Sequence, residues 1–171
     1  MLYNIYKGKE NSMILYHGSN VIVKEPKIID SDRKLDFGKG FYLTTDYEQA
    51  RKWALRTYER RKLGNASISV FEIEENTIKL LKVKKFKTAD KFWLSFITKN
   101  RIENYVQSDY DIIIGPVAND NTMPTVLLYL EGAYDEDEAI KRLLTQKLKD
   151  QVVFKTEKSL EYLKFKEEII L

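Results

Sequence analysis

Two short stretches of this 171-residue chain combine glycine with side chains that could contact a ligand. The first is His17-Gly18-Ser19, which contains the only histidine of the chain. The second is Phe37-Gly38-Lys39-Gly40-Phe41-Tyr42, in which two glycines flank a lysine. Glycine has no β-carbon, so the backbone at both stretches can approach a ligand closely. We therefore expect a ligand-binding site built around these two stretches.

The residue types present exclude several kinds of catalytic site. The chain has no cysteine, which rules out disulfides, thiolate metal sites and cysteine catalysis. With one histidine, only a metal site made of oxygen ligands is conceivable, and we predict no metal site. Ser19 lacks the sequence context of a nucleophilic serine, so a Ser-His-Asp hydrolase is not indicated.

The elements that must position the two stretches can be read from local patterns. The predicted strands and the predicted helix cover residues 13–16, 41–44 and 46–62. Thr45 or Asp46 can cap the helix. This layout brings Tyr42, on the second strand, within reach of Trp53, on the helix, at an opening widened by the glycines.

The rest of the chain mixes strands and helices without regular βαβ units. Strands are predicted over residues 68–73, 78–83, 110–114 and 151–154. Helices are predicted from residue 88 onward, over 135–148 and over 159–165, and residues 125–129 could be a strand or the start of a helix. Strands 68–73 and 78–83 would form a hairpin. This order favours an α+β fold over a parallel sheet.

Length and composition fit one globular domain. Hydrophobic residues make up 43% of the chain, a normal share for a globular protein. Residues 1–12 are polar and poorly patterned, so we predict a tail over 1–12 and a single domain over 13–171. No apolar run is long enough to cross a bilayer and no signal pattern precedes the domain, so we expect a cytoplasmic protein without a membrane partner.

Positive charge is concentrated in the first part of the chain. The formal net charge is +3, but residues 1–62 hold 13 lysines and arginines against 8 acidic residues. Much of the excess lies in the predicted helix, at Arg51, Lys52, Arg56, Arg60, Arg61 and Lys62. Such a helix could bind the phosphates of a small ligand or of nucleic acid, or it could be an ordinary solvated face. A nucleic-acid interaction module is therefore one functional hypothesis.

The two glycine-containing stretches resemble the ADP-ribosyltransferase superfamily, in the histidine-tyrosine branch that includes the poly(ADP-ribose) polymerases and diphtheria-type toxins. More closely, the chain resembles a small bacterial ADP-ribosyltransferase-like family of unknown function (DUF3990-like). The shared runs are Tyr16–Ser19, Asp36–Tyr42 and Tyr110–Ala118, and the likeness extends from Tyr16 to Phe165. It implies a split β-sandwich of two small sheets with flanking helices, and NAD+ as co-substrate.

The resemblance also implies roles for individual residues. His17 would bind a ribose hydroxyl of NAD+, and the main chain of Gly18 would pair with the nicotinamide carboxamide, with Ser19 as the small polar residue beside them. Tyr42 would stack on the nicotinamide ring. Trp53 matches a second stacking aromatic, although helix packing would explain it equally well. Two aromatic faces suit a pyridinium because a cation is attracted to a π-face.

The third motif of the branch departs from the pattern, because Gln151 falls where a catalytic glutamate is usual. Glutamine cannot ionise and so cannot act as a general base, but it can still hydrogen-bond the 2′-hydroxyl of the nicotinamide ribose. Asp120 is a candidate substitute carboxylate and Glu157 a second one, whereas Asp120 could instead form a turn. Arg101 could reach a pyrophosphate or only close a helix.

The resemblance therefore predicts a mono-ADP-ribosyltransferase that moves ADP-ribose from NAD+ to a protein or nucleic-acid acceptor. Because Gln151 leaves the nucleophile to be activated elsewhere, an acceptor that is already anionic would suit the site best. Family likeness also implies the toxin of a toxin–antitoxin pair, with a cognate antitoxin as partner. The alternative is a catalytically degenerate protein that binds NAD+ or ADP-ribose without turnover.

Overall fold

A computed structural model describes residues 11–29, 35–103, 109–119 and 121–171. Its strands are β1 (Ser12–Ser19), β2 (Phe41–Leu43), β3 (Ser67–Glu74), β4 (Val83–Lys85), β5 (Ile112–Pro116), β6 (Asp150–Phe154) and β7 (Lys164–Ile170). Its helices are α1 (Tyr47–Arg61), α2 (Glu75–Ile78), α3 (Lys91–Glu103), α4 (Met123–Leu130), α5 (Glu136–Leu144) and α6 (Glu157–Leu160). Residues 1–10 of the predicted tail lie outside the described residues, and β1 begins within the remainder of that tail. In the described ranges, no helix has the length and apolar content needed to cross a membrane.

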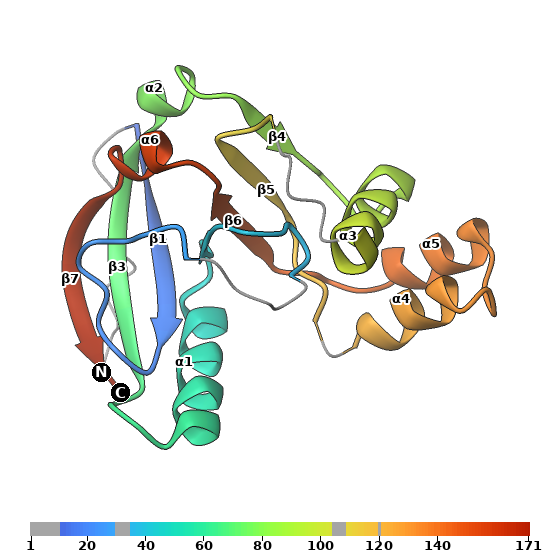
Figure 1. The fold of residues 1–171 in the computed structure, drawn as a ribbon, viewed down its shortest axis with the longest axis horizontal. Coiled ribbons are helices and arrows are strands. Elements are labelled where there is room, and N and C mark those ends of the chain that lie inside the picture. Colours follow the sequence, from blue (N-terminus) through green and yellow to red (C-terminus); the bar gives the residue numbers. More distant parts are fainter. Residues whose placement is uncertain (1–10, 30–34, 104–108, 120) are drawn as a thin grey trace.

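The described strands form two small sheets (Figure 1). One sheet has the order β1-β3-β7, and all its neighbours are antiparallel. The other has the order β2-β6-β5-β4, in which only the short strand β4 runs parallel to its neighbour. The predicted α+β class, with a split β-sandwich of two small sheets and flanking helices, is confirmed.

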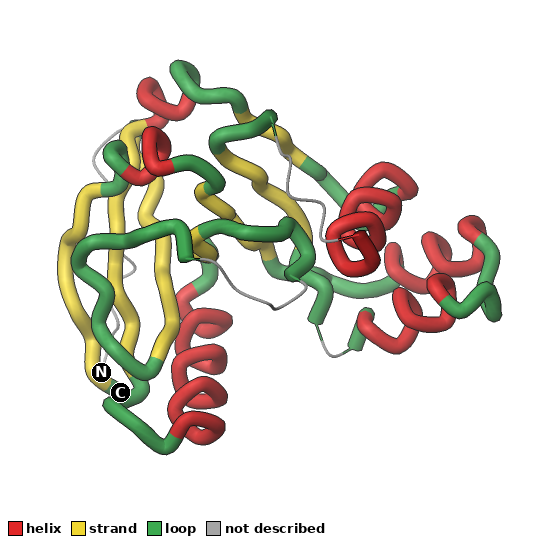
Figure 2. The backbone as a smooth tube through the Cα atoms, viewed as in Figure 1, coloured by secondary structure: helices red, strands yellow, loops and turns green. Residues whose placement is uncertain are grey.

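Buried side chains cover both faces of the sheets, because side chains on successive strand residues point to opposite faces, and helices pack beside the sheets (Figure 2). One cluster of buried side chains lies between the sheets and joins Leu15 and Phe71 to Phe41 and Phe154. A second packs α3, α4 and α5 on the outer face of the β2-β6-β5-β4 sheet, around Trp93. A third packs α1 on the outer face of the β1-β3-β7 sheet.

Helix α1 is fixed at its start and along its buried face. The Asp46 carboxylate accepts a hydrogen bond from the Gln49 amide at 2.7 Å, so Asp46, one of the two predicted caps, is the N-cap. Gly18 of β1 lies directly against the helix: a β-carbon there would overlap the carbonyl oxygen of Ala50 and stand 3.0 Å from the amide nitrogen of Ala54. Close approach between β1 and α1 therefore requires glycine at position 18.

Two predicted elements are wrong, and both errors have the same cause. Residues 78–83 do not return as a hairpin strand, because α2 ends β3 and the next strand, β4, joins the other sheet. The predicted helix over 159–165 is the short helix α6 followed by β7, which pairs with β3. In each case a distant strand partner decides the structure, and local apolar spacing carries no record of that partner. Residues 125–129, for which two structures were open, are helical within α4.

We predict that Gly18→Ala destabilises the fold by about 1–3 kcal/mol, the usual range for forcing extra volume into a packed site. Urea unfolding at neutral pH would measure the change. Ser19→Ala is the matched control. Ser19 is the next residue of β1 and already has a β-carbon, so alanine adds no atom there. Equal stability of the Gly18→Ala and Ser19→Ala variants would contradict the prediction.

Candidate functional site

The two glycine-containing stretches meet where β1 of one sheet touches β2 of the other. The amide of Tyr16 donates to the carbonyl of Thr44 at 2.8 Å, and the amide of Thr44 donates back at 3.0 Å. Next to this bridge, Nδ1 of His17 lies 2.8 Å from the carbonyl oxygen of Tyr42. The His17 ring also stacks on Phe41, with ring centroids 4.5 Å apart. The structure thus brings His17 and Tyr42 together, through the Tyr42 main chain.

The hydrogen bond to Tyr42 defines the chemistry of the His17 ring. A carbonyl oxygen can only accept, so Nδ1 must carry the proton, which leaves Nε2 of the neutral ring as an acceptor. Burial lowers the pKa of His17 below its ordinary value of 6.5, so the ring is neutral at physiological pH. No described buried side-chain nitrogen or oxygen lacks a partner, and no hydrogen bond reaches Nε2 from a described residue, so Nε2 keeps some contact with solvent.

Gly18 presents its main chain to the same junction. Tyr16 uses its amide and carbonyl to bond Thr44, on the side of β1 away from β3. Residues two apart in an antiparallel strand direct these groups to the same side, so the N–H and C=O of Gly18 also point away from β3. Gly18 is buried, yet within the described ranges no hydrogen bond reaches either group. Buried main-chain groups are nearly always paired, so this donor and acceptor call for a ligand or water.

Tyr42 uses its hydroxyl to hold the glycine turn. The hydroxyl donates to the carbonyl of Gly38 at 2.6 Å and accepts from the amide of Phe37 at 3.2 Å. Burial and the nearby Asp36 carboxylate raise the pKa of Tyr42 far above its usual range, so the phenol stays neutral. Tyr42 therefore cannot act as a base, and its ring packs against the buried cluster around Trp93.

Lys155, the residue after β6, binds the same turn. Its Nζ donates to the carbonyl of Phe37, and its stem passes the backbone of Gly40, where a β-carbon would lie 3.4 Å from Lys155 Cδ. Burial and the charge of Lys39 lower the pKa of Lys155 to about 8. Sequence reasoning missed this residue, because nothing in its own surroundings along the chain marks it.

A buried ion pair lies beneath the turn. Asp36 is 6% exposed, and its Oδ1 accepts hydrogen bonds from Nε of Arg101 at 2.8 Å and from Nη2 of Arg101. Its Oδ2 accepts from the amide of Ala118 at 3.0 Å and from Nε2 of Gln151 at 3.4 Å. Arg101, considered for a pyrophosphate, is thus paired with Asp36. The sequence does carry one signal for Asp36, because it is a charged residue next to an apolar, glycine-rich stretch.

This pair fixes which way the Gln151 amide points. Gln151 is 5% exposed, and its Nε2 donates to Asp36 and also to the carbonyl of Pro116 at 3.3 Å. Both neighbours are acceptors, so the nitrogen must face them and Oε1 must face away. No hydrogen bond from a described residue reaches Oε1, and no described buried polar side-chain atom is unpaired, so Oε1 reaches solvent. A glutamate here would place a second negative charge against Asp36.

Trp53 lies on the flank of α1 that faces the β2-β6-β5-β4 sheet. It is 51% exposed, so it is not packed in the core. Gln49, one helical turn earlier on the same flank, donates from Nε2 to the carbonyl of Asp150 in β6 at 2.8 Å. The opposite flank carries Tyr47, whose ring packs against Tyr16. Within the described ranges, no ring contact joins Trp53 to His17 or Tyr42.

The remaining candidates lie apart from these contacts or outside the described residues. Ser19 ends β1 and, two residues after His17, is on the same face of the strand. Glu157 begins α6 and accepts from the amide of Ile28 at 3.3 Å. Asp120 is not among the described residues. Asp150, which the sequence did not single out, accepts from the hydroxyl of Thr44 at 3.0 Å and so connects the residue after β2 to β6.

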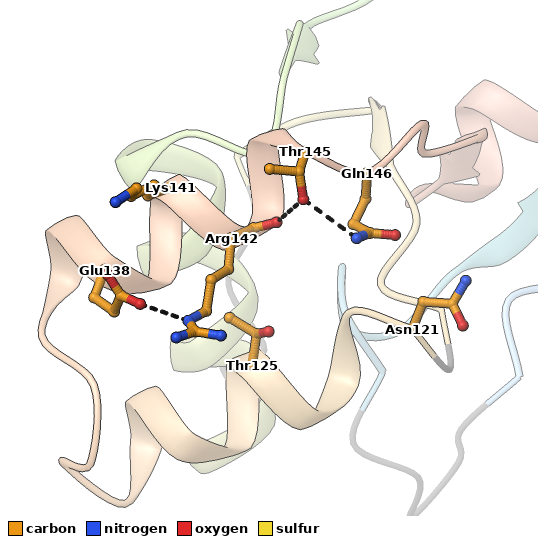
Figure 3. A pocket seen from close by; sticks show the side chains of 7 residues that line it. All are labelled: Asn121, Thr125, Glu138, Lys141, Arg142, Thr145 and Gln146. Atoms are coloured by element: carbon orange, nitrogen blue, oxygen red, sulfur yellow. Dashed lines mark hydrogen bonds and ion pairs between the residues drawn. The ribbon is translucent and has the colours of Figure 1, made fainter.

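A separate polar hollow of about 390 Å³ lies between α4 and α5 (Figure 3). Its lining residues are Asn121, Thr125, Glu138, Lys141, Arg142, Thr145 and Gln146. The Arg142 guanidinium is bound to Glu138 at 2.6 Å and lies over the ring of Tyr134. None of the residues predicted from the sequence lines this hollow, so we place the candidate site at the β1–β2 junction.

We predict that His17 titrates below pH 6.5, because burial disfavours its charged form. It is the only histidine of the chain, so its Cε1 proton gives a single NMR signal. The unfolded chain takes up this proton at a higher pH than the folded chain does. The free energy of unfolding should therefore fall as pH drops below 6.5, and fall less in His17→Gln. A midpoint at or above 6.5 would contradict the burial and tautomer described above.

We predict that Gln151→Glu destabilises the fold at pH 8 by about 2–4 kcal/mol, because a second carboxylate would face Asp36 and the Pro116 carbonyl. Adding Asp36→Asn to this variant should recover at least about 1 kcal/mol relative to the sum of the single changes. Urea unfolding measures both effects, and Gln146→Glu at an exposed position is the control. Strict additivity of the two changes would show that positions 36 and 151 are not coupled.

Comparison with known families gives one match, which covers both glycine-containing stretches. No curated protein and no solved structure matches the chain. A family model described as "Protein of unknown function (DUF3990)" matches residues 13–165, which include β1, the glycine turn and β6. The chain therefore belongs to the DUF3990 family.

Proposed function

We propose that this protein is a mono-ADP-ribosyltransferase that takes ADP-ribose from NAD+. The observation that carries the proposal is the buried main chain of Gly18, whose N–H and C=O receive no hydrogen bond from any described residue. A primary carboxamide offers one acceptor oxygen and an N–H donor, which complement this pair in two hydrogen bonds. Nicotinamide carries such a carboxamide, so the edge of β1 beyond the Tyr16–Thr44 bridge would hold the nicotinamide end of NAD+.

Two neighbouring side chains support the same ligand. The Nε2 of His17, which no described residue bonds, would accept a hydrogen bond from a ribose hydroxyl. Trp53 stands exposed on the flank of α1 beside Gly18, and its indole would cover the pyridinium ring, since a cation over an aromatic face is stabilised by about 1–2 kcal/mol. The likeness of the glycine-containing motifs to the histidine-tyrosine ADP-ribosyltransferases adds to this proposal.

The reaction needs little acid–base chemistry from the protein. The bond between C1′ of the ribose and the nicotinamide nitrogen breaks, and its electron pair neutralises the pyridinium charge of the leaving group. An acceptor atom then bonds to C1′. Oε1 of Gln151 would accept a hydrogen bond from the ribose 2′-hydroxyl and hold the ring, which is catalysis by positioning. A toxin role with a cognate antitoxin, in the cytoplasm, would follow from the family likeness alone.

A second candidate function is binding of NAD+ or ADP-ribose without turnover. The observation that favours it is the hydrogen bond of Gln151 to the buried Asp36, which fixes a group that cannot ionise at the usual position of the catalytic glutamate.

Incubation of the purified protein and cell extract with NAD+ labelled in its adenosine part would test the proposal. We expect free nicotinamide and a labelled acceptor, with nicotinamide release reduced at least tenfold in His17→Ala and Trp53→Ala. The control is Tyr58→Ala, which removes another exposed aromatic from α1.

The alternatives give different results in the same assay and in calorimetry. Saturable NAD+ binding by calorimetry without nicotinamide release would favour the binding protein. Absence of both binding and release would refute the proposal.

A further inference from the structure

Lysine side chains gather at the edge of the β2-β6-β5-β4 sheet that lies away from the β1–β2 junction. Among the described strands, β4 is the last of this sheet and pairs only with β5, and it lies between α2 and α3 (Figure 1). Lys84 of this surface is half-buried and its other lysines are exposed. We call the surface the lysine edge, and its residues are Lys82, Lys84, Lys85, Lys87 and Lys91.

Acidic side chains do not neutralise the lysine edge. No ion pair joins any of its five lysines to a described residue. Asp90 accepts two main-chain hydrogen bonds at the start of α3. Asp111 accepts from the amide of Lys82 and from the hydroxyl of Thr156. Asp109 is exposed and forms no ion pair with a described residue. Five lysines therefore lie near three carboxylates, and the edge keeps a net positive charge.

Aromatic rings lie among the cations of this surface. Nζ of Lys84 is 5.4 Å from the ring centroid of Phe86 and 6.0 Å from that of Tyr110. Nζ of Lys91 is 5.3 Å from the ring centroid of Phe92. The side chain of Phe92 is 65% exposed, so its ring is open to a partner. An exposed aromatic ring beside cations suits a nucleobase, which can stack on the ring while its phosphate contacts the cation.

The spacing of the lysines suits a polyanion better than a small anion. An extended chain rises by about 3.3 Å per residue, so Lys82 and Lys85, on either side of β4, are about 10 Å apart along the edge. Lys91 lies further along, at the start of α3. One phosphate cannot reach all of these positions, whereas a nucleic-acid strand carries a phosphate about every 3.4 Å along a duplex axis. Lysine contacts phosphate as a point charge, so such binding would not depend on base sequence.

Protection of an open strand edge explains only part of this arrangement. Lysines on an edge strand hinder its pairing with another molecule, and this role accounts for Lys84 and Lys85 of β4. It does not account for Lys87 and Lys91, which lie beyond the strand. An exposed phenyl ring at Phe92 also adds nothing to such protection.

We propose that the lysine edge binds single-stranded nucleic acid, with phosphates on the lysines and a base stacked on Phe92. The inference does not rest on the proposed function, because β4 and β2 are at opposite ends of their sheet. Bases in a duplex are already stacked on each other, so a duplex would offer this surface its phosphates alone.

Fluorescence anisotropy with a labelled 20-nucleotide strand, as RNA and as DNA of one sequence, tests the role of the lysines. We expect Lys85→Gln/Lys87→Gln/Lys91→Gln to weaken binding at least tenfold. The slope of log affinity against log salt should fall by about 2, since each phosphate contact on a single strand contributes about 0.7. The control, Lys27→Gln/Lys141→Gln/Lys147→Gln, removes the same charge from other exposed positions. Equal losses in the two triple variants, or no binding by the unaltered protein, would overturn the inference.

A second variant tests the stacking. We expect Phe92→Ala to weaken binding of the single strand at least fivefold and to leave binding of the matching duplex unchanged. Tyr58→Ala, which removes an exposed aromatic from α1, is the control, and urea unfolding checks that each variant folds. Unchanged single-strand binding in Phe92→Ala would overturn the inference. So would displacement of the strand by polyglutamate of equal charge, which would indicate an acidic protein as the partner. No arm contains NAD+, so these results leave the proposed function standing.

Discussion

The geometry of the candidate site depends on one junction, where β1 of the first sheet bonds β2 of the second. Two main-chain hydrogen bonds between Tyr16 and Thr44, and one from the His17 ring to Tyr42, hold the sheets at this point. The bridge stops at Tyr16, so Gly18, the next residue of β1 that points away from β3, bonds no described residue through its amide or carbonyl. The hydrogen bond from His17 to Tyr42 at this junction also fixes the His17 tautomer. It therefore both links the sheets and leaves Nε2 as the acceptor atom of the ring.

A second constraint is the buried Asp36 carboxylate, which determines what position 151 can be. Asp36 binds Arg101 on one oxygen and receives the Ala118 amide and the Gln151 amide on the other. An amide satisfies this environment, whereas an ionised side chain would face two acceptors. Gln151 therefore suits its surroundings. The proposed role of Gln151, which positions the ribose and takes no proton, follows from these hydrogen bonds.

Sequence patterns identified the elements whose signals are local. The Asp46 cap, the helix after β2 and the strands carrying the glycine motifs all follow from side chains within a few residues of one another. β7 and β4 were missed because pairing with distant strands determines them. In the site, His17, Gly18 and Tyr42 could be chosen from motif types. Two contacts of the site join residues far apart in the chain, so no local pattern predicts them. They are the ion pair of Arg101 with Asp36 and the hydrogen bond from Lys155 to Phe37.

The central claim is that the main chain of Gly18 and the Nε2 of His17 bind the nicotinamide end of NAD+. The most direct measurement is titration of ¹⁵N-labelled protein with NAD+, following the Gly18 amide and the His17 ring nitrogens by NMR. The account predicts that the Gly18 amide proton moves downfield on forming a hydrogen bond and that the Nε2 resonance of His17 shifts at the same NAD+ concentrations. Saturable binding that shifts other residues and leaves both of these signals unchanged would contradict it.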